Sequence, residues 1–375
     1  MFRFVRPLAK TGALSLCAFL VACPADDKAG DTKDPAKPET TEPQKPEVAP
    51  TETPPPAETP PAPAASHPEC VGPMTAEPAA TFAVGERQFD QKGSVLTLTT
   101  GDADDEFTIG QITDVKDWTP ENCANIRVAS KWFQGEKVDA IAVTGDLGES
   151  AEAIEKVLRE VASIGVPVLA IAGNRECRDH FSTALANVQK DHKNVINMNT
   201  VRVFNTDDVS FVSLPGYFNR SYIHCAEGCE YAPADVKALL EISKAATAPV
   251  RVLLSHGPPK QNGATALDRI HEDVNVGDPE LTKVLEAGLF PFGLFGNIQE
   301  AGGYGTDLSG EKRVAQDAFA DQLYVNPGPI DAVRWAMLDG TESLGMAGVF
   351  KIKGKQAKYK IYRMKAGEAK PETCK

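Results

Sequence analysis

The stretch VDAIAVTGDLGESAEAIEKVLREVASIG, residues 138–165, contains a strand pattern, a polar turn and a helix pattern in direct succession. The segment 138–144 is apolar apart from Asp139 and Thr144, which is typical of a buried strand. After the turn, apolar residues recur at helical spacing behind an acidic first turn, and Gly165 marks the end of the helix. This succession predicts an α/β fold.

Other segments repeat these patterns along the chain. A second helix is predicted for PADVKALLEISKAA (233–246), with a proline at its start. The segments 201–216 and 348–364 have the pattern of hairpins, so the predicted sheets are mixed. Four more apolar runs end at polar or glycine-containing turns and are predicted to be buried strands: FTIGQIT (107–113), PVLAIA (167–172), VRVLLS (250–255) and LFPFGLF (289–295).

The amino terminus has the features of an export signal. Three cations in residues 1–10 precede the apolar run GALSLCAFLVA (12–22), which is short for a membrane span. The sequence Leu20-Val21-Ala22-Cys23 resembles the lipobox of bacterial lipoproteins. The resemblance implies a signal peptide over residues 1–22 and a lipidated Cys23 that tethers an exported protein to the bacterial cell envelope, in the periplasm or at the cell surface. An ordinary signal peptide with a chance cysteine is the alternative.

The following segment, residues 23–68, is rich in Pro, Glu, Thr and Ala and has no aromatic residue. Such a composition cannot bury enough apolar surface to offset the chain entropy, so we expect a disordered stalk. Extended at roughly 3 Å per residue, it could hold a domain up to about 100 Å from the membrane. A proline-rich ligand for a partner is the alternative. The folded domain is predicted over residues 69–375.

Six cysteines remain in this domain: Cys70, Cys123, Cys177, Cys225, Cys229 and Cys374. An even set in an exported chain favours three disulfides, among 15 possible connectivities. The close spacing of Cys225 and Cys229 suggests a small loop closed on itself, although other pairings would serve. A zinc cluster is the alternative, but the spacing lacks a second close ligand pair.

The formal net charge of the 375-residue chain is −13. This charge argues against nucleic acid or anionic lipid as the partner, because both attract basic surfaces.

Polar residues follow five of the predicted strands. Because the carboxyl ends of strands in an α/β sheet are where ligand sites are built, these residues are expected to converge. Singly each signal is weak, since an aspartate after a strand is commonly a helix cap. In chain order the residues are Asp114, Asp146, Asn174, His256 and Asn297.

In order and spacing these residues resemble the motifs of the calcineurin-like metallophosphoesterases: DxH, GDxx[DE], GN[HR], a strand-end His and GHxH. The resemblance covers Thr108 to Gly328 and includes Asn326-Pro327-Gly328, which is similar to a late NPG turn of the family. It implies a four-layer αββα sandwich with mixed sheets, two metal ions and hydrolysis of phosphate esters.

Four positions match the metal ligands that the resemblance implies: Asp114, Asp146, Asn174 and His256. Four others depart from the family pattern. Lys116 stands where the first motif has its histidine, and Arg175 replaces the histidine that serves as general acid. Asn297 and Gln299 replace the two histidines of GHxH.

These departures predict the loss of the two-metal centre. The first metal position gains the Lys116 ammonium, which cannot bind a cation while protonated. The second keeps its ligands and has Asn297 as a poor fourth, better suited to Mg²⁺ or Mn²⁺ than to zinc. We therefore expect no metal or one weakly bound divalent ion. The nearest residues in sequence that could replace the missing ligands are His180, Glu149 and Glu300.

Two functions follow from this pattern. The first is a tethered, non-catalytic binding module of the phosphoesterase fold, whose partner is a protein or an anionic ligand attracted by Lys116 and Arg175. The same two cations could instead form internal salt bridges. The second is a residual or single-metal hydrolase of an exported phosphate ester. Both exclude nucleic acid as the partner and both place the protein at the membrane through its lipid anchor.

Overall fold

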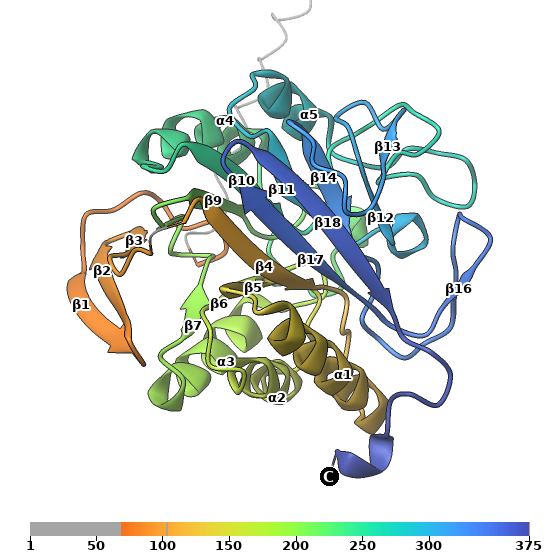
Figure 1. Ribbon diagram of the computed structural model, residues 1–375, viewed down its shortest axis with the longest axis horizontal. Helices are drawn as coiled ribbons and strands as arrows, with labels where there is room; N and C mark the ends of the chain where they lie inside the picture. Colours follow the sequence, from red (N-terminus) through yellow and green to blue (C-terminus); the bar gives the residue numbers. More distant parts are fainter. Residues whose placement is uncertain (1–68, 103, 375) are drawn as a thin grey trace, which may run out of the picture. The chain divides into compact units, whose positions relative to one another are not determined.

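The structure is a computed structural model that describes residues 69–102 and 104–374 (Figure 1). The predicted signal peptide, the lipidated Cys23 and the stalk over residues 23–68 lie outside the described residues. The described part forms two large β-sheets, a two-stranded ribbon and the helices that cover the sheets.

The first sheet is built around residues 138–165. Its strand order is β18-β17-β4-β5-β6-β7, with β4 to β7 parallel and with β17 and β18 antiparallel. Helices α1 (Pro120–Glu136), α2 (Ala151–Ala162) and α3 (Arg178–Asp191) connect the parallel strands. The strands span Glu106–Ile112 (β4), Ala140–Thr144 (β5), Val168–Ile171 (β6), Val195–Asn197 (β7), Met346–Lys353 (β17) and Gln356–Arg363 (β18).

The second sheet has the order β1-β2-β3-β8-β9-β10-β11-β14-β12-β13. Helices α4 (Pro233–Ile242) and α5 (Pro279–Glu286) follow its strands β9 and β10. The strands span Ala79–Val84 (β1), Arg87–Lys92 (β2), Val95–Leu98 (β3), Val203–Asn205 (β8), Val209–Leu214 (β9), Val250–Ser255 (β10), Phe292–Leu294 (β11), Tyr304–Thr306 (β12), Arg313–Val314 (β13) and Leu323–Asn326 (β14). The ribbon consists of β15 (Trp335–Ala336) and β16 (Glu342–Ser343).

The two sheets face each other across the main core. Phe107 of β4 contacts Phe211 of β9 with ring centroids 5.6 Å apart, and Phe292 of β11 contacts Phe350 of β17 at 5.7 Å. Helices α1 to α3 cover the outer side of one sheet, and α4 and α5 cover the other (Figure 1). The arrangement is the expected four-layer αββα sandwich with mixed sheets.

The predicted elements are confirmed where the local pattern was strong. All five apolar runs are strands, and helix α2 begins after Ser150, whose side chain accepts a hydrogen bond from the Ala153 amide. Strand β11 is shorter than predicted because Pro291 has no N–H for the ladder. Both hairpins form, as β8 with β9 and β17 with β18. Strands β1 to β3 and helices α1, α3 and α5 were not predicted.

Three disulfides join the six cysteines: Cys70–Cys229, Cys123–Cys374 and Cys177–Cys225. The predicted number is confirmed, but the predicted closed loop between Cys225 and Cys229 is wrong. The two side chains reach different neighbours, because Cys229 is buried in the core while Cys225 is half-buried beside Cys177. A backbone bridge between Cys177 and Gly228 brings that pair together. Disulfides of this kind indicate an extracellular or periplasmic environment.

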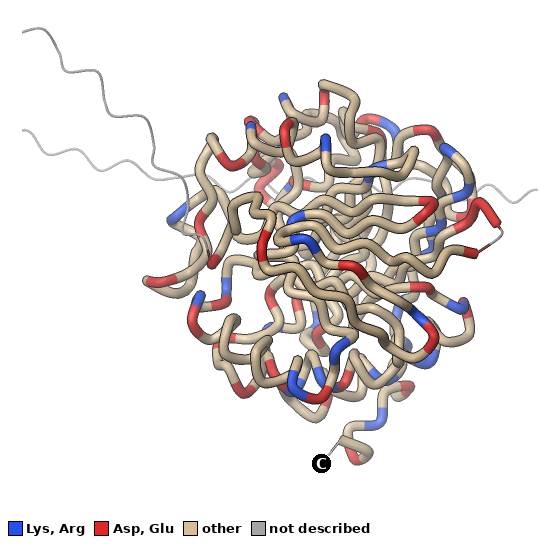
Figure 2. The backbone as a smooth tube through the Cα atoms, turned by 90° about the vertical axis from the view of Figure 1, so that its left-hand side faces the viewer, with Lys and Arg blue, Asp and Glu red and all other residues tan. Residues whose placement is uncertain are grey.

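Lys, Arg, Asp and Glu residues are interspersed along the backbone in the view of Figure 2. Many of them form exposed pairs, such as Arg127 with Glu160 at 2.7 Å. Each exposed pair contributes only about 0–1 kcal/mol, so the apolar core between the sheets supplies most of the stability. None of the helices in the described ranges is both long and apolar enough to span a membrane.

We expect the native domain to contain no reactive thiol. The double variant Cys70→Ala/Cys229→Ala should lose about 2–5 kcal/mol of unfolding free energy, because the bridge closes a long loop. Urea unfolding of the two proteins under non-reducing conditions measures the difference. Labelling of two or more thiols in the wild-type domain without denaturant would contradict the disulfide set.

Candidate functional site

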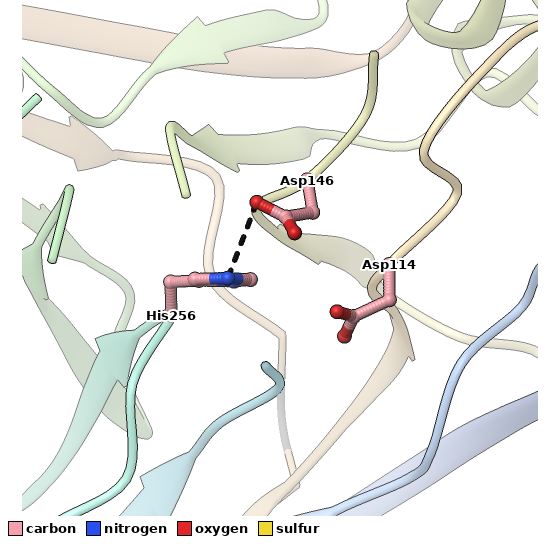
Figure 3. Close-up of side chains that lie close together, drawn as sticks. All are labelled: Asp114, Asp146 and His256. Carbon is pink, nitrogen blue, oxygen red and sulfur yellow. Dashed lines mark ion pairs between the residues drawn. The ribbon is translucent and has the colours of Figure 1, made fainter. Parts of the chain in front are cut away.

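The candidate site lies where the loops after five strands meet. Asp114 follows β4, Asp146 follows β5 and Asn174 follows β6 of the six-stranded sheet. His256 and Asn297 follow β10 and β11 of the other sheet. The site therefore lies at the carboxyl ends of strands from both sheets. The structure brings ligand atoms of three of these residues within 4.8 Å of one another, and these are Asp114, Asp146 and His256 (Figure 3).

The backbone of these loops is strained. Four non-glycine residues have left-handed backbone conformations: Asp114 (φ 56°), Lys116 (67°), Asp146 (58°) and Asn297 (64°). Such residues cost about 1–3 kcal/mol each and persist only where surrounding contacts fix them. The amide of Lys116 donates to the Asp146 carbonyl at 2.7 Å, which fixes two of them together. Gly173 is required beside them, because a Cβ there would lie 2.4 Å from the Asp146 carboxylate.

The Asp114 carboxylate accepts hydrogen bonds at both oxygens. Its Oδ2 accepts from the Thr113 hydroxyl at 2.8 Å and from the Asn297 backbone amide at 3.0 Å. Its Oδ1 accepts from Gln299 Nε2 at 3.3 Å. Asp114 is buried, so these donors compensate a charge that water cannot reach.

Lys116 is directed toward Asp331 and toward Trp335 of the ribbon β15–β16. Its ammonium lies 2.6 Å from Asp331, donates to Gln299 Oε1 at 2.8 Å and lies 4.0 Å from the ring centre of Trp335. Asp331 is 1% exposed and its other oxygen has no hydrogen-bond partner. Lys116 is therefore the main compensation for a second buried carboxylate, and Gln299 links that ion pair to Asp114.

Asp146, Asn174 and His256 form one buried network. Asp146 Oδ1 accepts from the backbone amides of Asn174 and Arg175, both at 3.0 Å, and lies 3.2 Å from His256 Nε2 (Figure 3). His256 Nε2 is also 2.7 Å from Asn174 Oδ1, and the side-chain nitrogen Nδ2 of Asn174 donates to the Tyr222 carbonyl at 2.7 Å. The latter bond fixes the orientation of the Asn174 amide.

The ring of His256 has the surroundings of an imidazolium. Its Nδ1 lies 2.7 Å from the Thr144 carbonyl, which can only accept, and the Nε2 partners are also acceptors. Burial opposes the charge, but the neighbouring carboxylates Asp146 and Asp114 outweigh it and raise the pKa of His256.

Glu176 lies behind this network and was not predicted from the sequence. It is fully buried, and its carboxylate accepts from the backbone amides of Leu147 and Gly173, so it ties the loops after β5 and β6 together. Burial, with the nearby Asp146 charge, raises the pKa of Glu176 to about 7. Its position in the turn Gly173-Asn174-Arg175-Glu176 was the signal that could have identified it.

Arg175 also lies in ion pairs. Its Nη1 is 2.8 Å from Glu149, and its Nε is 3.4 Å from Asp146 Oδ2. His180 and Glu300 were two of the residues that could have replaced the missing ligands. His180 contacts the Glu149 carbonyl at 2.7 Å, and Glu300 lies half-buried in the short helix Gln299–Ala301. Neither joins the cluster of Asp114, Asp146 and His256.

A cavity of about 380 Å³ opens beside the network. Tyr217, which follows β9 and was not predicted, lines it, and its ring centre lies 6.4 Å from that of His256. The lining residues are Asp146, Asn174, Arg175, Tyr217, Ser221, Tyr222, Ile223, His224, Ile270, Val276, Asn297, Ile298 and Gln299.

A pair of metal ions does not fit this set of side chains. At the first position Lys116 and Gln299 stand in place of the family's histidines, and Gln299 and the Asn297 backbone amide donate to Asp114, so these donors lie where a cation would bind. At the second position Asp146, Asn174 and His256 offer three ligand atoms, and His256 would have to release its Nε2 proton before it could bind an ion.

We expect the unfolding free energy to fall by about 2 kcal/mol between about pH 5 and about pH 8. The pKa of Glu176 is raised from 4.5 to about 7 on folding, so the folded state binds more protons. The stability that this proton provides is present at low pH and is lost as the pH rises through 7. The pKa of His256 is also raised, so His256 changes the stability in the same direction. Urea titrations in the presence of a chelator measure the slope.

The variant Glu176→Gln is the control for this prediction, because it cannot titrate. Its stability should depend less steeply on pH than that of the wild type, whatever its absolute value. An equal slope in the two proteins would contradict the assignment.

A family model and several solved structures are similar to this chain. The family model of the calcineurin-like phosphoesterases matches residues 107–283, which run from β4 to α5. None of the curated proteins matches the chain in sequence.

Several solved structures are similar at low identity. GAP50, the anchor in the inner membrane complex of Plasmodium, is 14% identical over 70% of this chain and 86% of its own, with a TM-score of 0.44. A dimetal phosphatase from Danio rerio is 12% identical over 69% and 99%, with a TM-score of 0.41. Phosphopantetheinyl hydrolase from Mycobacterium tuberculosis is 15% identical over 60% and 91%, with a TM-score of 0.37. The family match over residues 107–283 and the four-layer fold support a metallophosphoesterase-like domain in this chain.

Proposed function

We propose that this chain is an exported protein, tethered to the bacterial envelope through a lipidated Cys23, whose phosphoesterase-like domain binds a ligand or partner without two-metal catalysis. The observation that carries the proposal is the pairing of Asp114 with protein donors. Gln299 donates to Asp114 and accepts from Lys116, so one amide side chain links the aspartate to the ammonium that replaces a family histidine.

The chemistry of the family supports this reading. Two metal ions activate water and neutralise the phosphoryl oxygens during hydrolysis of phosphate esters. Lys116 is paired with Asp331, and Arg175 is paired with Glu149 and Asp146, so neither cation is left to take over that charge. Arg175 also cannot release a proton near neutral pH. Each missing element would lower the rate by about 10²- to 10⁴-fold.

A single-metal hydrolase is the second candidate. It is favoured by the ligand atoms of Asp114, Asp146 and His256, which lie within 4.8 Å of one another, and by the cavity that reaches Asp146. A hard ion such as Mg²⁺ or Mn²⁺ would suit the carboxylate and amide oxygens.

We expect the purified domain to contain no stoichiometric pair of metal ions and to hydrolyse an aryl phosphodiester little faster than buffer does. The variant Lys116→His/Asn297→His/Gln299→His should take up more metal, because ligand number and type set the affinity. Asp331→Asn should accompany these changes, since Asp331 would otherwise remain buried without its cation. Metal analysis after dialysis gives the stoichiometry.

The matched control is the same variant with Asp146→Ala added, which should lose the gained metal. Two tightly bound ions in the wild-type domain would overturn the proposal. So would hydrolysis at ordinary enzymatic rates that disappears in Asp146→Ala. One bound ion with slow, metal-dependent turnover would support the single-metal hydrolase instead.

The tether gives a separate prediction. The variant Cys23→Ser should move the protein from the membrane fraction to the soluble fraction or block its processing, because acyl chains contribute about 0.8 kcal/mol per buried methylene. Cell fractionation followed by immunoblotting measures the distribution. Cys17→Ser, inside the predicted signal peptide, is the control and should leave it unchanged. Unchanged membrane association of Cys23→Ser would contradict the proposed lipid anchor.

A further inference from the structure

The cavity beside the Asp146 network has the size of a small-molecule site. Its volume of about 380 Å³ lies within the range of pockets that enclose small ligands. It is bounded by loops from both sheets, including Asn174 after β6 and Asn297 after β11.

The charged groups that line this cavity compensate one another. Among the lining residues Arg175 and Asp146 lie 3.4 Å apart, and Arg175 is also paired with Glu149 at 2.8 Å. The lining residue His224 lies 3.5 Å from the same Glu149 carboxylate. Lys116 is not a lining residue, because its ammonium is directed to Asp331 and Trp335. No uncompensated cation therefore faces the cavity within the described residues.

This charge balance disfavours a phosphate ester as the ligand. A phosphate monoester carries about −1.5 to −2 charges at neutral pH, and its burial without an available cation is costly. The side chain of Glu149, 60% exposed beside Arg175, adds negative charge close to the cavity. A cationic ligand gains little either, because Asp146 already accepts from two backbone amides and faces Arg175 and His256.

The remaining lining groups are uncharged and amphipathic. Asn297 offers a side-chain amide, and Ser221 and Tyr217 each offer a hydroxyl. Tyr217 and Tyr222 meet edge to face with ring centres 6.3 Å apart, and Tyr222 is 50% exposed. Apolar side chains complete the lining, namely Ile223, Ile270, Val276 and Ile298. Such a surface suits a ligand that has hydroxyl groups on one side and C–H groups on the other.

Covalent and hydrogen bonds hold one wall of the cavity in place. The segment 221–224 is followed by Cys225, which is joined to Cys177, and the buried Cys229 is joined to Cys70. The Tyr222 carbonyl accepts from Asn174, and the His224 amide donates to the Asn174 carbonyl at 2.9 Å. A wall held in this way loses little conformational entropy on binding, which is how preorganised sites gain affinity.

We propose that this cavity binds a neutral saccharide. The inference rests on the proposed non-catalytic function, because it assumes that the charged side chains keep their ion pairs and bind no metal ions. The hydroxyl groups of the sugar hydrogen-bond to Asn297, Ser221 and the free N–H groups of Arg175, and its C–H face packs against Tyr222.

Isothermal calorimetry in the presence of a chelator tests the proposal with matched sugar pairs. Glucose and N-acetylglucosamine are the neutral probes, and their 6-phosphates are the charged counterparts. We expect at least one neutral sugar to bind about tenfold or more tightly than its phosphate, and Tyr222→Ala to weaken that binding about tenfold. Phe319→Ala, an exposed aromatic residue outside the cavity, is the control and should bind like the wild type.

Three results would overturn the inference. Absence of binding by both neutral sugars would do so while leaving the proposed function intact. Tighter binding of the 6-phosphates in the chelator would show an anion site, again without metal catalysis. Binding of a 6-phosphate that requires added Mn²⁺ and is followed by release of phosphate would overturn both proposals. Circular dichroism of each variant verifies folding.

Discussion

Three buried carboxylates in the loops have to be compensated whenever this domain folds: Asp114 after β4, Asp146 after β5 and Asp331 between β14 and β15. In this chain, side chains and backbone amides supply the compensation: Gln299 and the Asn297 amide at Asp114, His256 and two backbone amides at Asp146, and Lys116 at Asp331. The Asn297 amide bond to Asp114, together with the Lys116 amide bond to the Asp146 carbonyl, joins the four residues that have left-handed conformations. The loop geometry and the charge balance therefore depend on one set of contacts.

The fold could be predicted from the sequence where its signals are local. An apolar run followed by a polar or glycine-containing turn marks both a strand and its end, and this pattern located β4, β5, β6, β10 and β11. Because strand ends converge at one edge of each sheet, the same pattern also predicted that Asp114, Asp146 and His256 would lie close together. The strands β1 to β3 were missed because their residues are half-exposed and carry no strong apolar run.

The partners of the substituted residues could not be predicted in the same way. Lys116 contacts Asp331 and Trp335, which lie far along the chain near a short ribbon without a periodic pattern. The sequence indicated two cations at the site but not whether their charge was available to a ligand. The disulfides show the same limit, since the real pairs are separated by 48, 159 and 251 residues, whereas the close spacing of Cys225 and Cys229 favoured a local pair.

The bond between Cys70 and Cys229 also has a mechanical consequence. Cys70 lies at the amino-terminal end of the described domain, and Cys229 is fully buried beside Tyr217, whose amide donates to the Cys229 carbonyl at 2.9 Å. A pulling force applied to the amino-terminal side of Cys70 passes through this covalent bond directly into the core. The load bypasses β1 to β3, whose edge hairpin would otherwise unzip one hydrogen bond at a time. The domain can therefore bear tension from that side while the wall of its cavity keeps its shape.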